Sequence, residues 1–198
     1  KQAGLPWDVV FGSDLFGHAE ESILRDENDV LYEDDSSPNA HHIDGLIRFE
    51  SDLAYEVYKF LRSNIFPMVI GGDHSIAIGS ISGTKMAFPH ERLGVVWIDA
   101  HADLHSPWTT PSGNVHGMPL ALLMNIEKKG RNKPRVFTLD TWDRLRKIGM
   151  SGPKLLPSDL VFIGLRDYEP EEAAIIREHG IKVITVDELR QRGADQVV

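Results

Sequence analysis

The feature that most constrains the fold is a set of short apolar runs that recur between helix-like stretches. Each run is continuously apolar, rather than alternating between apolar and polar residues. Continuous apolarity is typical of strands in a parallel sheet whose two faces are both covered by helices. The runs are 67–70, 94–98, 160–164 and 182–186, with a weaker candidate for an edge strand at 7–11.

The segments between these runs have the apolar spacing of amphipathic helices. In 44–63, for example, the apolar side chains from Leu46 to Leu61 fall on one helical stripe. Further helices are predicted at 75–87, 118–127, 140–148, 170–179 and 187–192. Strands that alternate with helices predict an α/β fold of three layers, in which a doubly wound, mostly parallel sheet carries helices on both faces.

The chain of 198 residues is long enough for one domain with a sizeable core, so we expect a single domain over residues 1–198. The acidic stretch 20–35 is interpreted as a solvated connection. The chain begins with Lys1 rather than Met and ends at Val198, just after a predicted helix. We therefore expect the domain to be incomplete at its C-terminus.

The charge and residue content exclude several classes of partner. A formal net charge of -9 disfavours nucleic acid and anionic membranes, which both require a basic face, and it is compatible with a cationic substrate. The chain has 0 cysteines, which excludes disulfides and thiolate metal sites and favours the cytoplasm. No apolar stretch is long enough for a bilayer, and the N-terminus has no signal-peptide pattern.

The segment Asp-Ala-His-Ala-Asp directly follows the predicted strand 94–98. In extended chain, residues two and four apart point to the same side, so Asp99, His101 and Asp103 are expected to converge. Without a cation, two carboxylates so placed repel each other until one is protonated. A divalent metal removes that conflict, and Mn²⁺ suits this donor set, with Zn²⁺, Fe²⁺, Co²⁺ or Ni²⁺ as alternatives. The competing interpretation is a solvated loop with capping acids.

A second motif, Gly-Gly-Asp-His-Ser, directly follows the predicted strand 67–70. Gly71 and Gly72 allow the chain to leave the strand tightly, which presents His74 at the edge of the sheet. Ligands of doubly wound sheets bind beyond the carboxyl ends of the strands, where this motif and the previous one both fall. The same residues also fit a glycine turn followed by a helix cap.

A third motif places Ser112, Asn114 and His116 two residues apart on a downstream loop. Ser112 and Asn114 can donate hydrogen bonds to a carboxylate, and His116 can transfer a proton near neutral pH. Taken by itself, a loop histidine is usually just an exposed side chain. This one draws attention because of its neighbours.

A fourth motif covers 166–172, after the predicted strand 160–164. Pro170 suits the first position of a helix, and acids in the first turn favour the helix dipole. That structural explanation is sufficient for Glu172, and binding a substrate ammonium group is the alternative for Glu169 or Glu172.

In this order, Gly-Gly-Asp-His-Ser, Asp-Ala-His-Ala-Asp, Ser-Gly-Asn-x-His-Gly and Gly-Leu-Arg-Asp-x-Glu-Pro-x-Glu resemble the ureohydrolase superfamily, and most closely its arginases. The similarity runs from about residue 43 to about residue 189, which is most of the chain. The four motifs together are specific, although no single one is. The resemblance implies the arginase-like version of the α/β fold.

The resemblance implies a metal pair and a proton-transfer group. His74 and Asp103 match ligands of one Mn²⁺ ion, His101 matches a ligand of the other, and Asp99 matches the aspartate that bridges both. His116 matches the proton shuttle or general acid. Asp103 is grouped with His116 as catalytic because it holds an ion of the reacting pair.

The resemblance also implies how the substrate is held. Ser112 and Asn114 match groups that bind its α-carboxylate, while Glu169 and Glu172 match acids that bind its α-amino group, directly or through water. His105 stands where many arginases have an Asn that contacts the α-carboxylate, so that contact is altered or made by imidazole. Glu169 stands where many have Asp, which keeps the charge and lengthens the reach.

The family's second aspartate pair, in a Ser-Phe-Asp-x-Asp stretch, does not occur in these 198 residues, nor does a later Glu that faces the guanidinium group. We therefore expect this chain to carry an incomplete site. Turnover by these 198 residues alone is doubtful, and activity is expected of the complete protein.

The implied reaction is hydrolysis of L-arginine to L-ornithine and urea, in which a hydroxide bridging two Mn²⁺ ions attacks the guanidinium carbon. His116 would supply the proton that the departing amine needs. The alternatives are agmatinase, formimidoylglutamase, another guanidino-acid hydrolase, or a non-catalytic ureohydrolase-like scaffold. The resemblance further implies a homo-oligomer, as a trimer or hexamer.

Overall fold

Three parallel strands form a sheet within residues 37–197, the part of the chain that this computed structural model describes. Their order in the sheet is β1-β2-β3, with β2 in the centre. Phe162 on β2 is in register with Trp97 on β1 and Val183 on β3. The predicted parallel sheet is confirmed for these three runs. The strands are β1 (Val95–Ile98), β2 (Leu160–Leu165) and β3 (Lys182–Thr185).

All six predicted helices are present, with shifted ends in two cases. The helix predicted at 118–127 ends at Leu123, and the one predicted at 140–148 begins at Val136. The buried positions of the helix that begins at Val136 have the spacing of one helical face; they are Thr138, Thr141, Trp142 and Leu145. The helices are α2 (Ile43–Arg62), α3 (Ala77–Ala87), α4 (Pro119–Leu123), α5 (Val136–Arg146), α6 (Pro170–His179) and α7 (Val186–Arg192). Short 3₁₀ helices are η3 (His74–Ile76), η4 (Val115–Gly117), η5 (Pro157–Asp159) and η6 (Ala194–Gln196).

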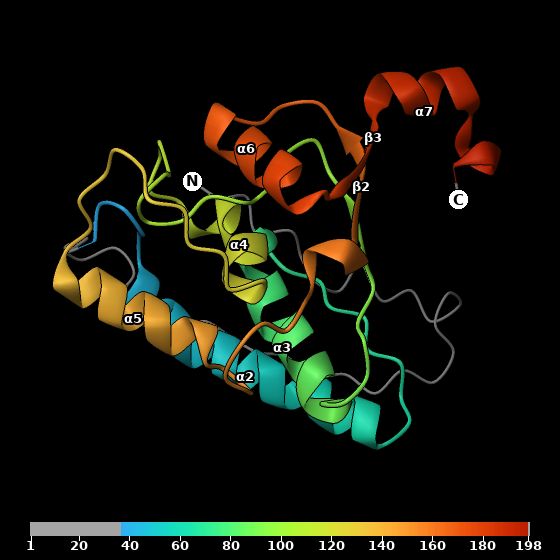
Figure 1. The fold of residues 1–198 in the computed structure, drawn as a ribbon. Helices are drawn as coiled ribbons and strands as arrows, with labels where there is room; N and C mark the ends of the chain where they lie inside the picture. Colours follow the sequence, from blue (N-terminus) through green and yellow to red (C-terminus); the bar gives the residue numbers. More distant parts are fainter. Residues whose placement is uncertain (1–36, 198) are drawn as a thin grey trace.

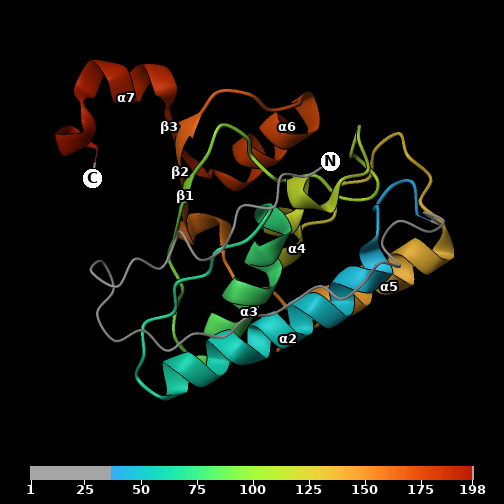
Figure 2. The same cartoon turned by 180° about the vertical axis from the view of Figure 1, so that it is seen from behind.

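Helices lie on both sides of the sheet. Helices α3 and α4 lie between the sheet and an outer pair formed by α2 and α5, whereas α6 and α7 lie on opposite sides of the strands (Figures 1 and 2). One core packs around Trp97, Phe162 and Leu104, and a second packs around Trp142 and Ile78 between the helices. The predicted three-layer α/β architecture is confirmed. Among residues 37–197, no helix combines the length and apolarity needed to cross a bilayer.

The segment 67–70 forms no strand, so that prediction is wrong. In the described part of the chain it has no strand partner, and exposed apolar side chains occur at every second position: Phe66 is 91% exposed, Met68 65% and Ile70 40%. A strand needs a neighbour to accept and donate its backbone hydrogen bonds, and Pro67 itself has no N–H to donate. A continuously apolar run thus favours a buried strand, but it does not show whether a neighbouring strand is there to pair with it.

Strand β1 departs from the prediction in a second way. We expected both of its faces to be covered, yet only Trp97 is buried, while Val96 is 60% exposed and Ile98 76%. The helices that cover Trp97 have no counterpart over the opposite face of β1 within residues 37–197. The predicted edge strand at 7–11 and the acidic stretch 20–35 lie outside the described residues.

Candidate metal centre

His74 opens the short helix η3, and its neighbour Asp73 caps that helix. Oδ1 of Asp73 accepts hydrogen bonds from the backbone N–H of Ser75 at 2.8 Å and from its hydroxyl at 2.6 Å. The imidazole of His74 packs edge-on against the indole of Trp97, with 4.8 Å between ring centroids. The cap and the candidate ligand are therefore adjacent residues with separate tasks. Sequence reasoning missed Trp97, whose only signal was an aromatic side chain one position before the end of a strand.

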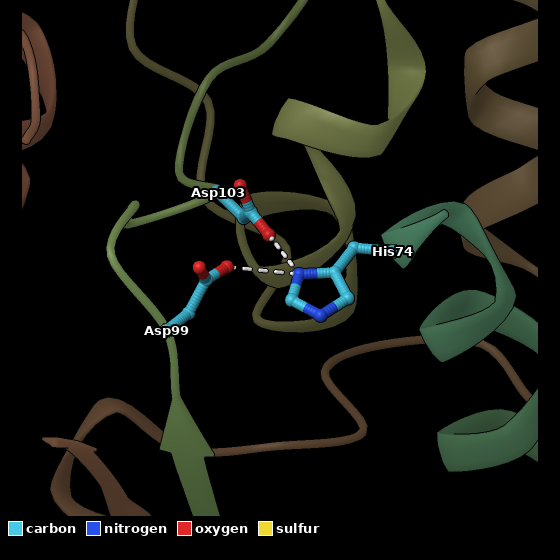
Figure 3. A group of neighbouring side chains, drawn as sticks. All are labelled: His74, Asp99 and Asp103. Carbon is cyan, nitrogen blue, oxygen red and sulfur yellow. Dashed lines mark hydrogen bonds and ion pairs between the residues drawn. The ribbon is translucent and has the colours of Figure 1, made fainter. Parts of the chain in front are cut away.

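Two carboxylates converge on one nitrogen of His74. Oδ2 of Asp103 lies 2.8 Å from Nδ1 of His74, and Oδ2 of Asp99 lies 3.0 Å from the same atom (Figure 3). Suitable ligand atoms of these three residues all lie within 4.8 Å of one another. The two aspartate side chains are largely buried, whereas the histidine is half exposed. Such a set of one imidazole and two carboxylates fits a divalent cation.

The loop that carries the two aspartates bends, contrary to the extended path predicted from their spacing. Strand β1 ends at Ile98, and Asp103 has φ of 50°, in the left-handed region. Aspartate tolerates that region better than most residues. Asp99 and Asp103 therefore meet because the chain curls back, and His101 between them points elsewhere.

His101 lies beside the other oxygen of Asp99. Its Nδ1 is 3.7 Å from Oδ1 of Asp99, its Nε2 is 3.8 Å from Oδ2 of Asp167, and its side chain is 62% exposed. His101 is thus outside the compact group of three. The two oxygens of Asp99 face different histidines, which is the arrangement expected of a carboxylate placed between two cations.

Burial raises the pKa of Asp103 above its usual value, and the hydrogen bond to His74 opposes that rise. Burial dominates because an ionised carboxylate loses its hydration inside the protein. A nearby cation would reverse this balance by favouring the charged form.

The loop with the third motif presents its polar residues on one side. Ser112, Asn114 and His116 are exposed, while Gly113 and Val115 between them are buried. Gly113 has φ of 80°, a conformation that glycine adopts without strain. The hydroxyl of Ser112 accepts a hydrogen bond from the backbone N–H of Asn114 at 3.2 Å.

His116 lies next to the cap of η3. Its Nδ1 is 3.8 Å from Oδ2 of Asp73, and its ring is half exposed. Because Asp73 directly precedes His74, this contact places His116 at the rim of the group formed by His74, Asp99 and Asp103.

A second cluster joins the loop after β1 to the start of α6. His105 is buried, and its Nε2 lies 3.0 Å from Oε2 of Glu169 and 3.6 Å from Oε2 of Glu172. Burial raises the pKa of Glu172 to about 8, and the adjacent Glu169 adds to that rise. The pKa of Glu169 is lowered by its hydrogen bond with Glu172 and by His105. One proton is therefore held on Glu172 while Glu169 carries the charge.

Comparison with known proteins identifies the fold and its relatives. Residues 16–198 match the model of the Arginase family. The chain belongs to the arginase family. It is 42% identical over 146 residues to an arginase of Bacillus caldovelox, an alignment that covers 74% of this chain. Among the solved structures that resemble this arginase-family chain is an arginase of Bacillus cereus, with a TM-score of 0.70, 32% identity and 83% of this chain covered.

An arginase of Entamoeba histolytica, solved in complex with L-ornithine, has a TM-score of 0.69 and 31% identity, and the match covers 81% of this chain. The chain spans about half the length of these relatives: 44% of the B. caldovelox protein, 51% of the B. cereus chain and 49% of the E. histolytica chain.

Proposed function

We propose that the natural protein carrying this sequence hydrolyses L-arginine to L-ornithine and urea with the help of two divalent ions, Mn²⁺ in the first instance. The observation that carries the proposal is the position of Asp99, whose two oxygens face His74 and His101 separately. His74, Asp99 and Asp103 would hold one ion, and Asp99 with His101 would contribute to the other. Two bound ions supply Lewis acidity and lower the pKa of water toward neutrality.

The substrate follows from the polar groups around that centre. Ser112 and Asn114 are exposed donors suited to an α-carboxylate, and the carboxylate of Glu169 is suited to an α-ammonium group. The L-ornithine bound to the E. histolytica relative carries both of these groups. Agmatine has no carboxylate and would leave the donors of Ser112 and Asn114 unused.

His116 is the residue suited to deliver a proton to the departing δ-nitrogen. Its half-exposed imidazole can accept and donate a proton, and its Nδ1 lies close to Asp73 at the rim of the centre. Near His116, Nδ1 of His74 and Oδ2 of Asp103 face each other through their hydrogen bond, so both candidate metal-ligand atoms lie on the same side of the centre.

The test combines metal content with urea release from L-arginine, agmatine and 4-guanidinobutyrate. We expect two Mn²⁺ ions per chain of the natural protein and preferential turnover of L-arginine. Asp99→Asn should lower kcat/KM by at least about 100-fold, because even partners of metal ligands cost 10–100-fold when they are changed. Asp195→Asn, at an exposed position near the C-terminus, is the matched control and should leave turnover unchanged.

Preferential turnover of agmatine would overturn the substrate assignment while keeping the metal centre. A metal-free protein without turnover of any guanidino compound would favour the scaffold interpretation. Restoring the metal-free protein with Mn²⁺, Zn²⁺, Fe²⁺, Co²⁺ or Ni²⁺ in turn identifies the ion. The single domain, the homo-oligomer and the cytoplasmic location stay predictions.

A further inference from the structure

The cluster of His105, Thr109, Glu169 and Glu172 is distinct from the group formed by His74, Asp99 and Asp103 and raises a separate question. The ring of His105 has a partner for each nitrogen: Nε2 lies 3.0 Å from Oε2 of Glu169, and Nδ1 lies 3.2 Å from Oγ1 of Thr109. Because a carboxylate only accepts hydrogen bonds, the Nε2–H must be the donor to Glu169. The buried ring therefore has no N–H directed toward a substrate carboxylate.

Glu169 and Glu172 differ in whether their carboxyl oxygens remain free to bind a ligand. Both oxygens of Glu172 accept backbone hydrogen bonds, from Leu104 N–H and from Glu169 N–H at 3.0 Å each, and its side chain is only 3% exposed. Glu172 thus ties the loop after β1 to the first turn of α6. The carboxylate of Glu169 is 49% exposed and keeps lone pairs open to solvent.

Two N–H donors hold the carboxylate of Glu169 in one orientation, beside its hydrogen bond with the side chain of Glu172. His105 binds it from the loop after β1, and the backbone N–H of Glu172 binds it through the capping box at the start of α6. A glutamate on its own loses rotamer freedom whenever it binds a ligand. Here the buried imidazole has already restricted that freedom before any ligand arrives.

We infer that His105 is a positioning residue that orients Glu169 as the one anionic contact, among the described residues, for the α-ammonium group of the substrate, with Glu172 confined to holding Glu169 and the backbone. This inference rests on the proposed function. His105 and Glu169 contact each other directly, so we treat them as one coupled pair.

The experiment compares L-arginine with 5-guanidinopentanoate, which is arginine without its α-amino group, in the Mn²⁺-loaded natural protein. His105→Asn and Glu169→Asp should each lower kcat/KM for L-arginine about tenfold, equivalent to 1.4 kcal/mol, mainly through KM. Neither change should alter kcat/KM for 5-guanidinopentanoate more than about twofold. The double variant should lose little more than the weaker of the two single variants, because each single change already breaks the same contact.

His179→Asn is the matched control, since it removes an exposed imidazole at the far end of α6. It should leave both substrates unaffected. A merely structural role for His105 predicts equal losses on both substrates, and this result would overturn the inference. So would additive losses in the double variant. Failure of the proposed function is distinguishable, because the unaltered protein would then release no urea from L-arginine.

Discussion

Among single residues, Glu50 is the least expected, because it is a fully buried carboxylate far from the predicted motifs in sequence. Its Oε2 accepts a hydrogen bond of 2.7 Å from the backbone N–H of Gly79, in the first turn of α3, while Oε1 has no partner within the described residues. Burial raises its pKa to about 8, against the effect of the Gly79 bond and with a small contribution from Asp73. The group is therefore protonated at neutral pH.

Glu50 should make folding stability depend on pH. Below the usual glutamate pKa, Glu50 is protonated in both the folded and the unfolded chain, so its ionisation does not lower the stability. Between that value and about 8 the unfolded chain ionises while the folded chain does not, so stability falls as pH rises. Glu50→Gln removes this dependence. Between pH 5 and pH 8, the free energy of unfolding of the variant should rise by roughly 3 kcal/mol relative to that of the unaltered chain, as measured by urea denaturation. An equal difference at both pH values would show that Glu50 is ionised when folded.

Among the elements, the crossing of α2 and α3 depends on two glycines on one face of α3. A Cβ at Gly79 would lie 2.8 Å from the carbonyl oxygen of Glu50, and one at Gly83 would lie 2.8 Å from Cβ of Val57 and overlap the carbonyl oxygen of Ala54. Glycine within a helix costs about 1 kcal/mol relative to alanine. The close approach of the two helices offsets that cost.

Gly83→Ala should therefore destabilise the chain by about 2 kcal/mol, although alanine is the better helix former. The matched control is Gly72→Ala, whose added Cβ would meet nothing within 4 Å and whose φ is not positive. It should change the free energy of unfolding by no more than about 0.5 kcal/mol. Thermal unfolding of both variants decides, and a stabilised Gly83→Ala would show that the helices can separate freely.

At the scale of the whole molecule, strand β1 has an open edge and an open face among the described residues. Within residues 37–197, β1 pairs only with β2, and Val96 and Ile98 are exposed on its outer face. The segment 66–70 also exposes apolar side chains, those of Phe66 and Met68. Unpaired strand edges and contiguous apolar surface promote association between chains.

We expect this chain of 198 residues to self-associate through that surface. Ile98→Lys should increase the monomer fraction in sedimentation velocity, because it places a charge where an apolar side chain is 76% exposed. Ser158→Lys adds the same charge at another exposed position and serves as the control. If both substitutions act equally, net charge rather than the open strand controls association.

Local sequence was sufficient for the elements whose stability is local. The stripe in α2 and the Pro170 start of α6 predicted helices that the structure confirms, because helix hydrogen bonds join residues close in the chain. The three paired strands were recognisable from continuous apolarity. The segment 67–70 had the same pattern and failed, because strand formation depends on a partner that lies elsewhere.

The sequence by itself determined the family and most of the order of strands and helices, and it supplied the candidate residues for metal binding and proton transfer. Only the tertiary structure decided how they meet. It placed His74 between Asp99 and Asp103 across 29 positions of chain, through the left-handed turn at Asp103. It also bound His105 to Glu169 across 64 positions. Side-chain type and spacing are local properties. The contact of His105 with Glu169 depends on how β1 and β2 align the loops at their carboxyl ends, and that of His74 with Asp103 depends on how η3 packs against Trp97 of β1.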